Sequence, residues 1–209
     1  MNKKVTAHLS VLFANIIYGA NYSIAKEVMP SLIKPFGFIV IRVCTAAILF
    51  LLTYLLLFRE KIERSDWPRL FACAVFGVAV NQLLFFKGLS LTSPINSGLM
   101  MVTNPIFVLV LSFILLSEPI TTRRVIGIAC GISGASLLII FGGHITSGVS
   151  NPLGDLYILI NSLSYALYLV MVLPMMKKYH PVTIMQAVFL MGSVMVLPFG
   201  WGEFTEIQW

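Results

Sequence analysis

The apolar residues of this chain are gathered into seven long runs that alternate with short polar segments. The runs are Leu9–Ala25, Phe36–Phe58, Leu70–Phe86, Pro94–Leu116, Val125–Phe141, Leu153–Met175 and Val182–Trp201. Each is close to the roughly 20 residues that an α-helix needs to cross a hydrocarbon layer about 30 Å thick. Lipid offers no partners to unpaired backbone groups, so such runs cross it as helices. The pattern therefore predicts an all-α, polytopic membrane protein with about seven transmembrane helices.

The composition argues against a soluble protein. Of the 209 residues, 58% are apolar and 11% are charged, whereas an ordinary soluble domain has roughly 25% charged residues. A soluble domain of this size leaves too much surface in water to hide so many apolar side chains. Histidines and cysteines are scattered singly, and no pattern typical of a hydrolase, a phosphate-binding loop or a metal site occurs. We therefore predict no enzyme activity, no catalytic residue, no metal and no cofactor.

The basic residues predict the orientation of the chain in the membrane. The net charge is +6, but most of these residues lie in short loops between the runs, which argues against a nucleic-acid partner. One set of loops carries ten of them, Lys3, Lys4, Arg59, Lys61, Arg64, Arg69, Arg123, Arg124, Lys177 and Lys178. The other set carries three, Lys26, Lys34 and Lys87. Because Lys and Arg accumulate on the cytoplasmic side, we expect the N-terminus to lie in the cytoplasm.

Residues 142–153 divide the chain into two unequal parts. They contain no Lys or Arg and are rich in Gly, Ser and Asn, as is typical of an external loop. Residues 1–141 hold five runs and residues 154–209 hold two. Two successive five-helix units must insert with opposite orientations, which is an inverted repeat. A constant offset of 147 residues pairs Tyr18 with Tyr165 and Asn21 with Tyr168, although apolar helices also give such matches by chance.

A series of short motifs resembles the drug/metabolite transporter superfamily and its EamA-type members. In chain order the motifs are Tyr18-Gly19-Ala20-Asn21 with Lys26, Arg42 with Ala46-Ala47, Asn81 to Leu89, Thr92 to Ser97, Pro105, Ser117-Glu118-Pro119, Gly127 with Gly131 and Gly134, and Gly154-Asp155. Each motif is weak alone, but their order and spacing are fairly specific. The resemblance implies a ten-helix transporter of small organic solutes, which we expect in a bacterial inner membrane.

The chain holds only seven of the ten helices that the resemblance implies, because the second unit stops after its second helix. Two interpretations stay open. The 209 residues are either a fragment of a longer product or a truncated product. A truncated product would be a noncatalytic membrane subunit that pairs with or modulates a complete transporter. The oligomeric state, including a homodimer, also stays open.

Arg42 is the one basic residue inside an apolar run, about six residues from the start of that run. A charge near the bilayer centre costs about 2.5 to 3.5 kcal/mol on insertion scales. In one interpretation Arg42 contacts an anion or carboxylate in a substrate cavity. In the other, its long side chain reaches the outer headgroups, roughly 9 Å away at 1.5 Å per residue.

Other polar side chains within the runs are further candidates for contact with a substrate. A polar stripe facing lipid is costly, so these residues must face other helices or a cavity, and hydrogen bonds between helices would explain them equally well. Tyrosine walls suit amphipathic or ring-containing substrates. The candidate substrate-binding residues are Tyr18, Asn21, Arg42, Asn81, Asn96, Asn104, Tyr165 and Tyr168.

Pro105 predicts a kink in the fourth run. Proline inside a helix removes one backbone N–H and displaces the carbonyl of Met101. A kink beside Asn104 is a suitable place for gating. At the end of the same run, we expect Glu118 to form an ion pair with one of the two arginines at 123 and 124.

Small residues recur every four positions in the fifth run, at Gly127, Gly131 and Ala135. This spacing predicts close packing of that helix against a neighbour. Together with the five-plus-two arrangement of runs, these observations favour a secondary transporter that imports or exports small organic metabolites or drugs. It would work by alternating access, with one repeat rocking against the other.

Overall fold

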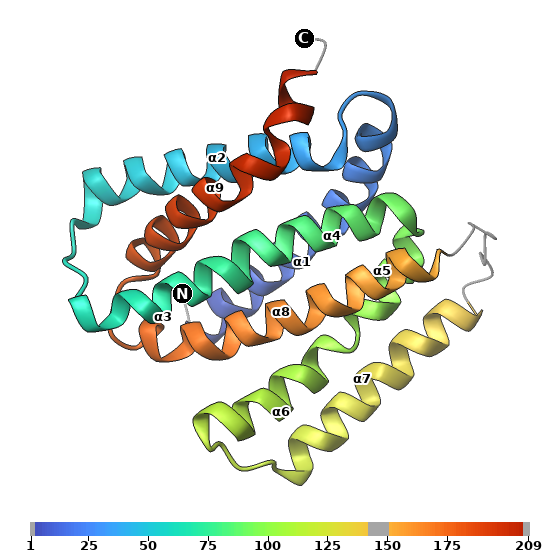
Figure 1. The fold of residues 1–209 in the computed structure, drawn as a ribbon. Helices are drawn as coiled ribbons and strands as arrows, with labels where there is room; N and C mark the ends of the chain where they lie inside the picture. Colours follow the sequence, from blue (N-terminus) through green and yellow to red (C-terminus); the bar gives the residue numbers. More distant parts are fainter. Residues whose placement is uncertain (1–2, 142–150, 207–209) are drawn as a thin grey trace.

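The computed structural model describes residues 3–141 and 151–206, and within these residues the chain is helical and contains no strand. The helical segments are α1 (Lys3–Ser31), α2 (Pro35–Thr53), η1 (Tyr54–Phe58), η2 (Arg64–Asp66), α3 (Trp67–Ala74), η3 (Val75–Ala79), α4 (Val80–Leu91), α5 (Pro94–Met101), α6 (Asn104–Leu116), α7 (Thr122–Phe141), α8 (Pro152–Met176) and α9 (Pro181–Thr205). They form a bundle in which α2 lies along α9, α4 lies along α8, and α6 and α7 form one edge (Figure 1).

All seven predicted runs are helical in the structure. Five helical stretches among the described residues are long and apolar enough to cross a bilayer. They are Pro35–Phe58, Arg64–Leu91, Pro94–Leu116, Pro152–Met176 and Pro181–Thr205. The first and fifth predicted runs lie within α1 and α7. The prediction of an all-α fold with membrane-spanning helices is confirmed.

Four helices begin with a proline, whose fixed φ and missing N–H suit the first helical position. These helices are α2, α5, α8 and α9, which start at Pro35, Pro94, Pro152 and Pro181. In the last three, the side chain of the residue before the proline accepts a hydrogen bond from a backbone N–H of the first turn. Local chemistry therefore sets where these helices begin.

Glycines bring α4 and α8 into close contact. A Cβ added at Gly88 would lie 2.9 Å from the carbonyl oxygen of Gly154, and one at Gly154 would lie 3.1 Å from the carbonyl oxygen of Gly88. One turn further along, the hydroxyl of Thr92 donates to Asp155 Oδ1 at 2.7 Å. Backbone contact and this hydrogen bond together define how α4 and α8 lie relative to each other.

The glycines of α7 do not make the close contact that their spacing predicts. A Cβ added at Gly127 or Gly131 would meet no atom of the described residues within 4 Å outside its own helix. Both residues instead line open grooves beside α6. The surroundings of Ala135 lie outside the described part of the chain. Close approach through small residues occurs at Gly88 and Gly154, because α4 and α8 lie inside the bundle whereas α7 lies at its edge (Figure 1).

The fourth predicted run is interrupted beside Pro105. Helix α5 ends at Met101 and α6 begins at Asn104, with Pro105 in the first turn of α6. The hydroxyl of Thr103 donates to the carbonyl oxygen of Met100 at 2.6 Å within the break. At the other end of α6, Arg124 Nη1 lies 3.0 Å from Glu118 Oε2, so the expected ion pair of Glu118 is present.

Candidate functional site

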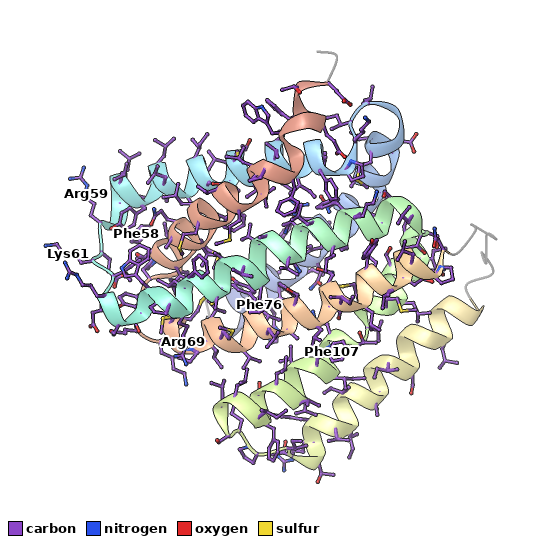
Figure 2. The ribbon with its side chains drawn as sticks, in the orientation of Figure 1. Phe58, Arg59, Lys61, Arg69, Phe76 and Phe107 are labelled. Atoms are coloured by element: carbon purple, nitrogen blue, oxygen red, sulfur yellow. The ribbon has the colours of Figure 1, made fainter. Side chains whose placement is uncertain are left out.

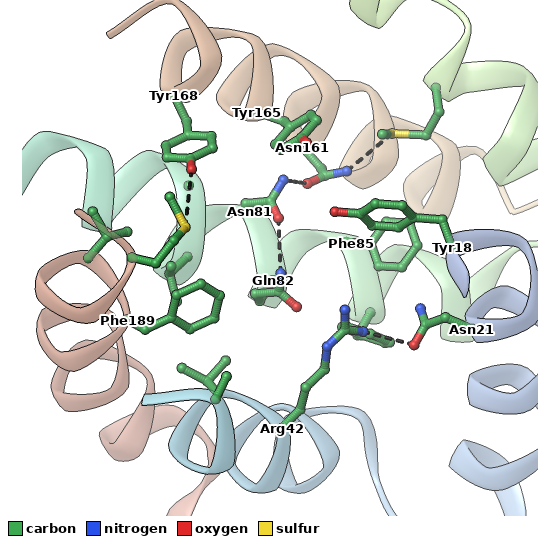
Figure 3. A pocket seen from close by; sticks show the side chains of 18 residues that line it. Tyr18, Asn21, Arg42, Asn81, Gln82, Phe85, Asn161, Tyr165, Tyr168 and Phe189 are labelled. Atoms are coloured by element: carbon green, nitrogen blue, oxygen red, sulfur yellow. Dashed lines mark hydrogen bonds between the residues drawn. The ribbon is translucent and has the colours of Figure 1, made fainter. Parts of the chain in front are cut away.

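A cavity of about 310 Å³ opens between α1, α2, η3, α4, α8 and α9 (Figure 3). Most of its wall is apolar or aromatic, and a few polar side chains reach into it from α1, α2, α4 and α8. Six of the eight predicted substrate-binding residues line it, namely Tyr18, Asn21, Arg42, Asn81, Tyr165 and Tyr168. An apolar cavity with a few converging polar groups is the usual form of a small-molecule site.

Arg42 of α2 reaches into this cavity (Figure 3). Its Nη1 donates a hydrogen bond to Asn21 Oδ1 of α1 at 2.9 Å, and its Cζ lies 5.3 Å from the centroid of the Phe86 ring. Among the described residues, no carboxylate lies within ion-pair distance of the guanidinium. Arg42 therefore lines the cavity, and its contact with an anion stays a prediction.

Three amide side chains form a hydrogen-bonded chain along one wall of the cavity. Gln82 Nε2 donates to Asn81 Oδ1 at 3.3 Å, and Asn81 Nδ2 donates to Asn161 Oδ1 at 2.6 Å. Asn161 Nδ2 then donates to the thioether sulfur of Met101 at 3.4 Å. This amide chain, defined by Gln82, Asn81, Asn161 and Met101, runs from α4 across α8 to the end of α5.

Two stacked tyrosines form an aromatic wall on α8. The ring centroids of Tyr165 and Tyr168 are 5.9 Å apart, with planes inclined by 26°. The Tyr168 ring lies against Gly77 of the π-helical turn η3, where an added Cβ would come within 2.4 Å of the ring. Only glycine leaves room for Tyr168 here, so Gly77 positions the aromatic wall. Such π turns inside α-helices are frequent at functional sites.

Two predicted residues, Asn96 and Asn104, do not line this cavity. Asn96 lies in the first turn of α5, where its backbone N–H donates to Ser93 Oγ at 3.1 Å. Asn104 borders a second space of about 720 Å³ between α6, α7 and α8, together with Pro105. Asn104 lies beyond the break after Met101, at the start of α6.

Asn161 lines the cavity although it does not belong to the predicted set. Asn161 is 1% exposed and sits in the middle of the apolar helix α8. Its neighbours Ser162 and Ser164 make this a short polar stretch within an apolar run, which is the signal that could have indicated it. The apolar lining residues, such as Phe189, have no comparable signal, because their residue types equally suit packing.

Away from the cavity, side chains tie together the loops that precede α3 and α9. Lys178 Nζ lies 2.6 Å from Glu63 Oε2 and 2.7 Å from Asp66 Oδ2. The hydroxyl of Tyr179 donates to Asp66 Oδ2 at 2.6 Å and accepts the backbone N–H of Glu63 at 3.0 Å. Hydrogen bonds to Asp66 and then to Glu63 raise the pKa of Lys178 above its ordinary value. We call these four residues the loop lock.

Comparison with known proteins identifies the family. The EamA-like transporter family matches residues 5–140. An uncharacterized transporter of Archaeoglobus fulgidus is 26% identical over 95% of this chain and 67% of its own length. The uncharacterized transporter YyaM of Bacillus subtilis is 28% identical over 93% of this chain and 65% of its own length.

A solved crystal structure shares the fold with a TM-score of 0.63 and 17% identity, covering 89% of this chain and 64% of that chain. The chain spans about two thirds of the length of the curated relatives described above. Its apolar helices and its relatives agree that it is an integral membrane protein. With well over half of its residues matched, the chain belongs to the EamA-like transporter family.

Proposed function

We propose that this chain forms the substrate cavity of a secondary transporter that carries small organic anions, whether metabolites or drugs, by alternating access. The observation that carries this proposal is Arg42, a guanidinium that lines the cavity and has no carboxylate partner among the described residues. Arginine stays protonated in proteins. A carboxylate or another anion in the cavity would balance its charge.

The energetic reason lies in the cost of a charge at membrane depth. Insertion of an arginine near the bilayer centre costs about 2.5 to 3.5 kcal/mol, and the neutral amide of Asn21 offsets only part of it. An anionic group would add charge-assisted and bidentate hydrogen bonds, which are stronger than neutral ones. The transported anion would therefore bind beside Arg42, whose charge is poorly solvated while the cavity is empty.

The remaining wall favours an organic anion over an inorganic one. Phe85, Phe189 and the stacked pair of Tyr165 and Tyr168 supply apolar and aromatic surface around the cavity. Such surface would bind the carbon skeleton of a small metabolite or drug. Movement of one repeat against the other would then expose the cavity to each side in turn, with the break at Pro105 as a place for gating.

We extend the proposal to the orientation of the protein in a bacterial inner membrane, with the N-terminus in the cytoplasm. Arg59, Lys61 and Arg69 lie at one end of the bundle (Figure 2). Lys178 belongs to the same end through the loop lock. Basic loops that share one end support a cytoplasmic position for it. Labelling of a Lys61→Cys variant by an impermeant thiol reagent outside intact cells would contradict this orientation.

The test is uptake by the full-length gene product in liposomes, with labelled organic anions, cations and neutral compounds of similar size. We expect uptake of anions, and Arg42→Gln should reduce it about 10- to 100-fold, as expected for loss of a hydrogen bond to a charged group. Uptake of any neutral substrate should be unchanged. Arg69→Gln is the matched control, because Arg69 is exposed outside the cavity.

Two results would contradict the proposal. One is a wild-type protein that moves no compound of the panel while its reconstitution is verified. The other is an Arg42→Gln variant that loses uptake of all compounds to the same degree, which would assign Arg42 a structural role.

A further inference from the structure

We propose that Asn21 determines the charge of the cargo, because it holds the guanidinium of Arg42 at the cavity without neutralising it. Asn21 is then a positioning residue, and the neutrality of its amide keeps the site selective for anions. A carboxylate at the same place would cancel the charge and abolish this selectivity. The inference rests on the proposed function for the anion, and it adds the residue on which the preference for negative charge depends.

The packing of α1 directs Asn21 toward the bundle. Ala25 and Met29 follow it at intervals of four residues and are 0% and 4% exposed. Residues four apart lie on one face of a helix, so Asn21 belongs to the same inward face. Its side chain lines the cavity (Figure 3), and its Oδ1 accepts the hydrogen bond from Arg42 Nη1 at 2.9 Å. This hydrogen bond links α1 to α2 at the wall of the cavity.

Two uncharged groups hold the guanidinium of Arg42. One is the amide of Asn21, and the other is the ring of Phe86, whose centroid lies 5.3 Å from Arg42 Cζ. Phe86 is fully buried and meets the ring of Phe38 edge-on, with the two centroids 5.2 Å apart. Its ring is therefore a fixed surface beside the cation. Neither contact brings a negative charge, so Arg42 is positioned but its charge is not compensated.

Arg42 is the single charged residue among the described residues that line the cavity. The polar groups around it are neutral amides and tyrosine hydroxyls. Within the described part of the chain its guanidinium makes no second hydrogen bond, and its other nitrogens are not among the buried atoms that lack a partner. Those nitrogens therefore keep accessible surface, which a ligand needs for direct contact.

An amide and a carboxylate have almost the same shape, so the choice between them at Asn21 is a choice of charge. A guanidinium can only donate, and both groups offer it an oxygen. A carboxylate would form a charge-assisted ion pair with Arg42, and a transported anion would have to compete with it. The amide orients the same guanidinium and leaves its charge for an anion from outside the protein.

The experiment compares two probes of similar shape that differ in charge. They are the anion 3-phenylpropionate and its neutral amide 3-phenylpropionamide, whose phenyl ring suits the aromatic wall. Calorimetry measures the binding of each to the purified full-length gene product in detergent, and the readout is the ratio of the two affinities. Asn21→Asp introduces the carboxylate. Asn151→Asp is the matched control, because Asn151 caps α8 outside the cavity and Asp serves equally well as a cap.

We expect the wild type to bind the anion at least about tenfold more tightly than the amide, as hydrogen bonds to a charged group would give. Asn21→Asp should lower this ratio to about one or below, whereas Asn151→Asp should keep the wild-type ratio. A wild-type ratio in Asn21→Asp would overturn the inference and leave the proposed function standing. A folded wild-type protein that binds neither probe, or prefers the amide, would overturn both.

A second variant, Asn21→Leu, separates the charge from the hydrogen bond and also serves if the carboxylate prevents folding. It removes the acceptor of Arg42 but adds no charge, so the guanidinium stays uncompensated. The ratio should fall but remain at least about threefold in favour of the anion. A ratio near one in Asn21→Leu would make the hydrogen bond the determinant in place of the charge, and would overturn the inference. Equal weakening of both probes by Asn21→Asp would assign Asn21 a structural role, with the same consequence.

Discussion

At each end of the α2–α9 pair, a glutamate that follows one helix contacts the residue before the other helix. At one end Lys34, which precedes α2, pairs with Glu206, which follows α9. At the other end the backbone N–H of His180, which precedes α9, donates to Glu60 Oε2 beyond α2 at 2.9 Å. Glu206 lies 146 residues after Glu60, and His180 lies the same 146 residues after Lys34. At each end, the segment after one helix thus contacts the segment before the other.

The ends differ in what surrounds this shared contact. Beside Lys34, a single carboxylate caps α2, because Glu203 Oε2 accepts the backbone N–H groups of Phe36 and Gly37 at 2.7 and 3.0 Å. Beside His180, the loop lock joins the segments before α3 and α9 through several charged hydrogen bonds. The two ends therefore share one kind of contact but differ in the hydrogen bonds beside it. We expect the loop-lock end to resist separation more strongly than the capped end.

The strongest test of this difference is Tyr179→Phe at the loop lock. Tyr179 is 7% exposed, and its hydroxyl is the only part that this change removes. The backbone N–H of Glu63 and the carboxylate of Asp66 would each lose a partner. We expect a loss of about 2 kcal/mol in unfolding free energy, measured by thermal or detergent unfolding of the purified protein. Tyr157→Phe on α8 is the control, and an equal loss there would remove the distinction.

At the capped end, Glu203→Ala should have a smaller effect. It removes the acceptor of two backbone N–H groups at the start of α2. Loss of a helix cap costs typically about 1 kcal/mol, so the unfolding midpoint should fall by less than in Tyr179→Phe. Glu206→Ala is the matched control, since its ion pair with Lys34 is exposed on both sides and exposed pairs contribute little. A larger loss from Glu203→Ala than from Tyr179→Phe would reverse the comparison.

The smallest expected effect is a pH dependence of the loop lock. The pKa of Lys178 is raised above its ordinary value of 10.5 by its hydrogen bonds to Asp66 and Glu63. A raised pKa in the folded state means that Lys178 contributes its full stabilisation below pH 10.5 and loses it as the pH rises through the folded-state pKa. The unfolding midpoint should therefore decline above about pH 10.5. Lys178→Met should flatten this decline, whereas Lys61→Met in the same pair of loops should not.

Much of the fold could be predicted because its signals are local. A run of apolar residues long enough to span a bilayer identifies a helix without reference to the rest of the chain, and all seven predicted runs are helical. Prolines mark the starts of α2, α5, α8 and α9 as well as the break beside Pro105. Polar residues within apolar runs likewise pointed to Arg42, Asn21 and Asn81, since lipid cannot solvate them.

The sequence by itself therefore determined the helices, the membrane as their surroundings and most of the polar residues of the cavity. Only the tertiary structure decided which of those residues meet. Asn81 and Asn161 are 80 residues apart, and their contact depends on how α4 and α8 approach through Gly88 and Gly154. Hydrophobicity is a property of each residue, whereas hydrogen-bond partners depend on the rotation and spacing of whole helices. For that reason the hydrogen bond from Asn161 to Met101, an ordinary apolar residue in the sequence, became visible only once the helices were placed.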